Sequence, residues 1–122
     1  MASVEVSLKE MTAGIEGALG AAVVDYTSGM ALGTLGGSKS LDLTVAAAGN
    51  TDVIRAKVRT MEQLGLKGQI EDILITLGKQ YHIIRPVSRK EGTFIYFVLD
   101  KSKSNLALAR RKAQDVEREL TV

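Results

Sequence analysis

The chain has 122 residues with 16 Lys and Arg against 14 Asp and Glu, and this net charge of +2 gives no indication of a nucleic-acid partner or of binding to a membrane surface. It contains no cysteine, which excludes a disulfide framework, thiolate metal sites and cysteine nucleophiles, and which fits a cytoplasmic protein. We expect a single domain over residues 1–122 without direct membrane insertion, because this length suffices for one core and no apolar run approaches the roughly 18 residues of a membrane span.

The first segment has the pattern of a short amphipathic helix. Its apolar residues recur at the spacing of one helical stripe: Val4, Leu8, Met11 and Ile15. Ser7 and Glu10 have the spacing of a capping box within this segment. Glycines from Gly14 onward interrupt the pattern, so we predict that the helix ends there.

A β-hairpin is predicted next. An apolar run over residues 21–24 leads into Asp25-Tyr26-Thr27-Ser28-Gly29, whose residues favour turns. A second extended run covers residues 30–35. Two extended runs joined by such a turn are typical of antiparallel neighbours.

The longest periodic segment runs from Asp42 to about Leu64 and predicts a helix. One apolar stripe is expected to face the core and comprises Leu43, Ala47, Ile54, Val58 and Met61. A second strip of smaller residues lies beside it and comprises Ala46, Gly49, Val53 and Ala56. Small side chains allow another element to approach closely, but alanine also favours helices in its own right, so the pattern leaves both explanations open.

Three strand-like runs follow this helix. The first covers residues 69–77 and alternates so that Ile73, Ile75 and Leu77 share one face. A short Gly78-Lys79 loop joins it to a second run over 80–87, which predicts an antiparallel pair.

The third run, over residues 93–99, is almost continuously apolar, as is typical of a central strand. Between the second and third runs, Arg85 and residues 89–91 are charged, and we interpret them as solvated turns. The last segment predicts an amphipathic helix from its apolar stripe, which comprises Leu106, Ala109, Ala113, Val116 and Leu120. The predicted order of elements is therefore α-β-β-α-β-β-β-α.

The stretch GTLGGSKS, from Gly33 to Ser40, is one residue away from the nucleotide-binding pattern G-x-x-x-x-G-K-[ST]. Ser38 stands where that loop needs glycine to turn its backbone amides toward phosphate. The preceding strand also belongs to a predicted antiparallel hairpin, whereas such loops normally lie in parallel sheets. We therefore interpret the match as misleading and keep a small nucleotide-binding enzyme as the weaker alternative.

Other catalytic or metal sites are not indicated. His82 is the single histidine, and no cysteine accompanies it as a metal ligand. It lies in a predicted strand, where we interpret it as a structural side chain. We expect no catalytic residues, no cofactor and no metal.

Several local features together resemble the roadblock/dynein light chain family, in particular its bacterial single-domain members. They are the segment GIEGALGAAVVDYTSGMALGTLG, the alanine-rich central helix and the NLALARRKAQDVEREL segment that begins at Asn105. The resemblance covers nearly the whole chain and contains no catalytic signature. It implies an α+β fold with a five-stranded antiparallel sheet between helices, in the order second, first, fifth, fourth, third strand.

The resemblance also implies a homodimer in which the third strands pair across a two-fold axis and the long helices pack antiparallel. We therefore predict a dimer interface formed by Ala46, Gly49, Val53, Ala56, Glu71, Ile73, Ile75 and Leu77. The function implied is that of a non-catalytic regulator or scaffold that binds a small Ras-like GTPase. A structural dimerisation module in a motor or signalling assembly is the alternative.

Overall fold

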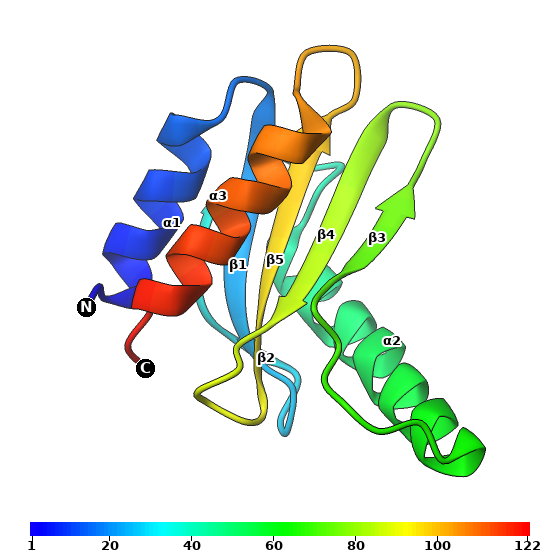
Figure 1. Ribbon diagram of the computed structural model, residues 1–122. Helices are drawn as coiled ribbons and strands as arrows, with labels where there is room; N and C mark the ends of the chain where they lie inside the picture. The colour runs from blue at the N-terminus through cyan, green and yellow to red at the C-terminus, as the bar shows by residue number, and fades with distance from the viewer.

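The computed structural model describes residues 1–122 and has the predicted order of elements (Figure 1). The helices are α1 (Val4–Gly14), α2 (Leu43–Leu64) and α3 (Leu106–Glu119). The strands are β1 (Ala18–Asp25), β2 (Met30–Gly36), β3 (Ile73–Thr76), β4 (Gln80–Pro86) and β5 (Thr93–Asp100). All neighbouring strands are antiparallel, and their order in the sheet is β2-β1-β5-β4-β3. The predicted fold class and strand order are confirmed.

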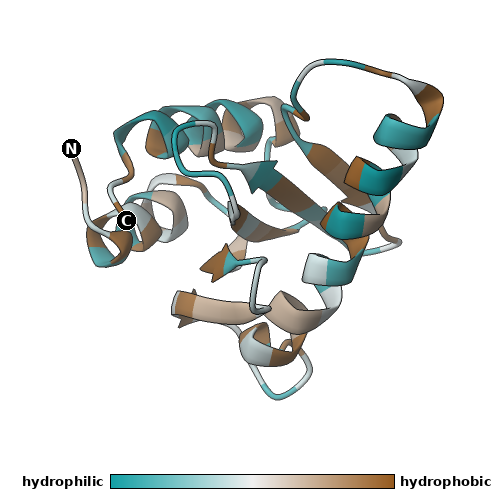
Figure 2. Cartoon of the chain, turned by 90° about the horizontal axis from the view of Figure 1, so that it is seen from below, coloured by the Kyte–Doolittle hydropathy of each residue, from teal (hydrophilic) through white to brown (hydrophobic).

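The sheet lies between α1 and α3 on one face and α2 on the other (Figure 2). β5 is the central strand, and seven of its eight residues are buried. Its side chains alternate between the two cores, since Ile95, Phe97 and Leu99 belong to the α1–α3 side. Phe94 and Tyr96 belong to the α2 side. The continuous apolar run in the sequence therefore follows from burial on both faces of the sheet.

The helices begin at side chains that cap their free amides. The carboxylate of Asp42 accepts hydrogen bonds from the first turn of α2, and the side chain of Asn105 does the same for α3. At α1 the capping residue is Ser3, whose hydroxyl accepts from the N–H of Val6. The prediction of a capping box at Ser7 is wrong, because Ser7 lies one turn inside the helix and its hydroxyl is buried.

β3 is shorter than the run that predicted it. The pairing with β4 extends only from Ile73 opposite Ile84 to Thr76 opposite Tyr81. Before β3, the side chain of Asp72 pairs with Arg110 of α3, on the face of the sheet opposite α2. After β3, the N–H of Leu77 bonds to the carbonyl of Gln80 within the turn. The predicted strand ends over 69–72 and at 77 are therefore wrong, because these residues serve the connections.

Candidate protein-interaction surface

The second half of α2 extends beyond the sheet (Figure 1). The buried residues of α2, which are Leu43, Ala47, Thr51 and Ile54, all lie at or before Ile54. At 22 residues the helix is about 33 Å long. Its backbone lies nearest to β1 and β2, and its buried side chains also pack with Phe94 and Tyr96 of β5. The predicted core stripe is therefore wrong beyond Ile54, because Val58 is 36% exposed and Met61 is only half-buried.

The small-residue strip of α2, defined as Ala46, Gly49, Val53 and Ala56, is accessible at the surface. Gly49 and Ala56 are exposed, Ala46 is half-buried, and Val53 is 37% exposed. A Cβ atom placed on Gly49 meets no other atom within 4 Å. Open space therefore lies beside Gly49, whereas Ala46 packs at the edge of the α2-side core.

A shallow groove joins the small-residue strip to β3. Its lining comprises Val53, Ala56, Lys57, Thr60, Ile70, Asp72 and Ile73. The side chains of Ile73 and Ile75 are half-buried and pack on the α2-side core, so they face the same way as the strip. β3 pairs only with β4, and its outer edge has no partner strand. The fold therefore places most of the predicted interface residues on one surface.

Two of the predicted interface residues lie elsewhere. Glu71 is exposed before β3 and lines a separate cavity on the other side of α2. Leu77 is 44% exposed in the turn between β3 and β4. Both positions follow from the short β3, since neither residue takes part in the strand whose alternation suggested them.

The stretch from Gly33 to Ser40 does not form a phosphate-binding loop in this structure. The N–H of Ser38 bonds to the carbonyl of Leu41, the N–H of Leu41 bonds back to the carbonyl of Ser38, and the N–H of Gly37 bonds to Leu19. The following helix begins at an aspartate, whose negative charge occupies the place where a phosphate binds in such loops. These amides therefore donate to carbonyls of the same chain and do not point toward a phosphate.

His82 lies on the α2 side of β4 and uses both ring nitrogens in hydrogen bonds. Its Nδ1 lies 2.8 Å from the hydroxyl of Tyr96, and its Nε2 lies 2.8 Å from Oε1 of Gln80. Burial lowers the pKa of His82, because the charged imidazolium loses hydration. Burial likewise raises the pKa of Tyr96. This geometry agrees with a structural role, and no cluster of three metal-ligating side chains occurs.

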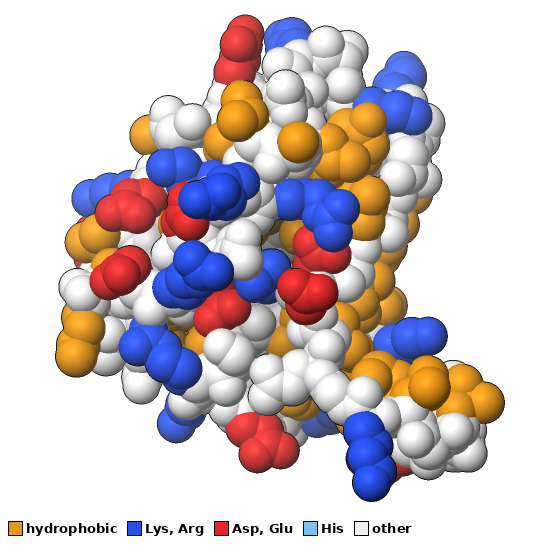
Figure 3. Space-filling model, viewed as in Figure 1, with side chains coloured by type: hydrophobic (Ala, Val, Ile, Leu, Met, Phe, Trp, Pro, Cys, Tyr) orange, Lys and Arg blue, Asp and Glu red, His pale blue; other side chains and the backbone are white.

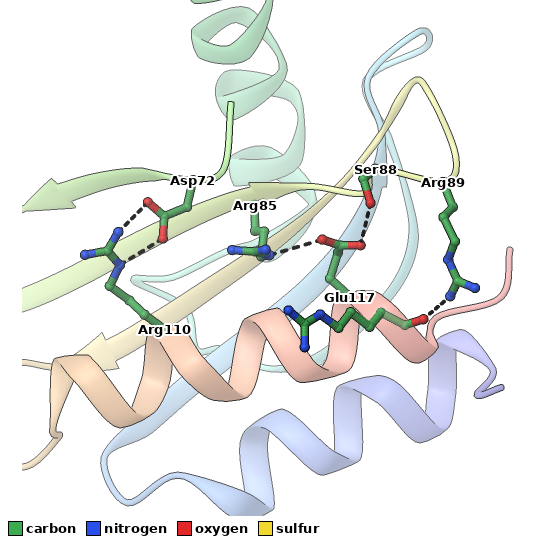
Figure 4. A network of polar contacts seen from close by, with 7 residues as sticks. Asp72, Arg85, Ser88, Arg89, Arg110 and Glu117 are labelled. Carbon is green, nitrogen blue, oxygen red and sulfur yellow. Dashed lines mark hydrogen bonds and ion pairs between the residues drawn. The ribbon is translucent and has the colours of Figure 1, made fainter. Parts of the chain in front are cut away.

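An ion pair and two hydrogen bonds join α3 to the end of β4 and the residues that follow it (Figure 4). The guanidinium of Arg85, whose side chain is 12% exposed, donates to Oε1 of Glu117, and the hydroxyl of Ser88 donates to Oε2. Arg89 donates to the carbonyl of Arg118 near the end of α3. The interpretation of Arg85 as part of a solvated turn is therefore wrong. Glu117 was missed as a buried residue, although it lies four residues after Ala113 and so continues the buried stripe of α3.

A second ion pair, which is bidentate, joins Arg110 of α3 to Asp72, with both nitrogen–oxygen distances at 2.9 Å. The hydrogen bond to Asp72 raises the pKa of Arg110. Lys, Arg, Asp and Glu side chains are intermixed over α1 and α3 in Figure 3, whereas hydrophobic side chains gather toward the β3 side and the end of α2. The apolar surface available to a partner therefore lies away from the charged helices.

No model of a protein family matches the sequence, and no curated protein matches it. No helix of the structure has both the length and the apolar character needed to cross a membrane. Three features of the fold can be compared with solved structures: the antiparallel sheet between helices, the free edge of β3 and the overhang of α2.

These features define the roadblock fold. A Roadblock/LC7 domain from Streptomyces avermitilis has a TM-score of 0.83 to this chain at 9% identity, covering 97% of this chain and 94% of that one. MglB from Myxococcus xanthus has a TM-score of 0.80 at 15% identity, covering 95% and 83% of the two chains. An MglB structure described as a tetrameric arrangement is similar at a TM-score of 0.81, with 15% identity and the same coverage. The chain therefore has the fold that its sequence resemblance implied.

Proposed function

We propose that this chain forms a homodimer that acts as a non-catalytic regulator or scaffold for a small Ras-like GTPase. The observation that supports it best is the free edge of β3 beside the uncovered small-residue strip of α2. An unpaired edge with exposed apolar neighbours tends to aggregate unless a partner covers it. A second copy of the chain offers the same edge and the same strip, as an isologous interface requires.

In this dimer the two β3 strands pair antiparallel, and the two α2 strips face each other. Small residues at Gly49 and Ala56 let the helix backbones approach closely, and Val53 with Ile73 supplies apolar area to bury. Glu71 and Leu77 lie at the rim of this arrangement rather than within the strand pair.

The GTPase is proposed as the partner of this platform because the sequence resembles a family whose members bind such proteins. The similarity to MglB in a tetrameric arrangement supports assembly beyond a single chain. The internal use of the amides around Ser38 supports a nucleotide carried by the partner rather than by this chain.

Sedimentation velocity at tens of micromolar tests the dimer. Val53→Arg places a long charged side chain in the strip and should reduce the association constant at least tenfold. Ala48→Arg is the matched control, because Ala48 is exposed on α2 but outside the strip. A monomeric wild-type protein, or equal association of both variants, would refute the proposed interface.

An affinity pull-down from the native lysate tests the partner. It is run with GDP, with a non-hydrolysable GTP analogue and without added nucleotide. Recovery of a small GTPase that depends on the nucleotide supports a regulator or effector. A partner recovered equally under all conditions favours the alternative, a structural dimerisation module in a larger assembly.

A further inference from the structure

A cavity of about 620 Å³ lies on the side of α2 that is turned away from the small-residue strip. It is bordered by the second half of α2, the connection after that helix, the end of β4 and the end of α3. Ile54, Val58 and Met61 line it from α2, and Ile70 and Val87 line it from the connection and from the residues after β4. The cavity therefore combines these apolar side chains with the polar and charged residues that complete its lining.

The charges around this cavity are unequal. Four carboxylates and two guanidinium groups line it, and the buried pair of Arg85 and Glu117 neutralises one of each sign. Among the rest, Glu62, Glu71 and Glu91 are exposed and form no ion pair, and they face one unpaired cation, Arg118. The carboxyl-terminal end of α2 adds the negative end of a helix dipole. The open cavity therefore has an excess of negative charge.

We infer that this cavity is a docking cleft for a protein segment that carries an aliphatic side chain next to lysine or arginine. The aliphatic group fills the space between Val58 and Val87, and the cation meets the carboxylates of Glu62 and Glu91 at the rim. The cleft belongs to one chain and uses a different face of α2 from the proposed dimer interface. A dimer therefore carries two such clefts. They would bind a further protein segment in addition to the GTPase of the proposed function.

Two acetylated and amidated hexapeptides serve as probes. In one lysine alternates with leucine, and in the other glutamate alternates with leucine. Each is titrated into the ¹⁵N-labelled protein while amide resonances are followed. The lysine peptide should saturate with Kd of about 1 mM or tighter and shift the amides of Leu66, Gly68 and Val87, whereas the amides of Gly49 and Ala56 should stay in place. The glutamate peptide should bind at least tenfold more weakly.

A pair of charge-reversal variants separates the cleft from net charge. Glu62→Lys with Glu91→Lys should weaken the lysine peptide at least tenfold. Glu10→Lys with Glu16→Lys makes the same change of net charge at two exposed, unpaired carboxylates outside the cleft, and should leave binding within about twofold. Circular dichroism checks that both variants are folded.

No saturable shift with the lysine peptide, equal affinity for both peptides, or equal losses in both variants would overturn the inference. The same samples are examined by sedimentation velocity. Peptide binding to a protein that stays monomeric supports the cleft while refuting the proposed dimer, and a dimer without peptide binding does the reverse.

Discussion

Gly49 offers a prediction in which the stability of one chain and the association of two chains change in opposite directions. Glycine in the middle of a helix is about 1 kcal/mol less favourable than alanine. A Cβ atom at Gly49 meets no atom within 4 Å, and the residue does not have a positive φ, so the Gly49→Ala variant gains helix propensity without steric cost. With an unfolding entropy of about 2.1 cal/mol/K per residue over 122 residues, that gain raises Tm by about 4 °C.

In the proposed dimer the same methyl group lies between two closely packed helices and is present twice. Overpacking of this kind costs about 1–3 kcal/mol, so the association constant should fall at least about fivefold. Stability is measured by urea unfolding at a concentration where the protein is monomeric, and association by sedimentation equilibrium. Unchanged or lower monomer stability would show that the space beside Gly49 is not open. Higher stability with unchanged association would remove Gly49 from the interface.

Two further predictions concern single side chains. Ser3→Ala removes the cap of α1 and should lower the free energy of unfolding by about 1 kcal/mol. Ser7→Ala removes a buried hydroxyl without a hydrogen-bond partner and should raise the free energy of unfolding by about 1 kcal/mol. A lower free energy of unfolding for Ser7→Ala would contradict this reasoning. Burial holds the pKa of folded His82 below its unfolded value of about 6.5, so the stability that His82 contributes is present above that pH and is lost as the pH falls through its lower folded pKa. His82→Phe should flatten unfolding free energy between about pH 5 and 7, where no other histidine titrates, and an unchanged slope would refute the assignment.

The element order and the sheet were predictable from the sequence because each element carries a strong periodic pattern. The stripe of α3 and the apolar run of β5 each predicted an element whose burial is confirmed. Ends were less predictable, because they depend on partners that are distant in sequence. β3 begins only after Asp72, which binds Arg110 in a contact across 38 residues that no local pattern contains. Ser3 and Ser7 are equally plausible caps by composition, and only the observed start of α1 distinguishes them.

The candidate surfaces were predictable only in part, and α2 shows why. Periodicity gives the direction in which a helical side chain points but not how far the sheet beneath it extends. The core stripe, the small-residue strip and the face that carries Glu62 differ only in the direction in which their side chains point. The strip could therefore be found from the sequence. The overhang begins after Ile54, because α2 is longer than the part of the sheet it crosses. That mismatch leaves Ala56 beyond the sheet and opens the cleft. Ala46, Gly49 and Val53 lie before the overhang and on a face of α2 that carries none of its buried residues, so the direction given by periodicity accounts for most of the strip.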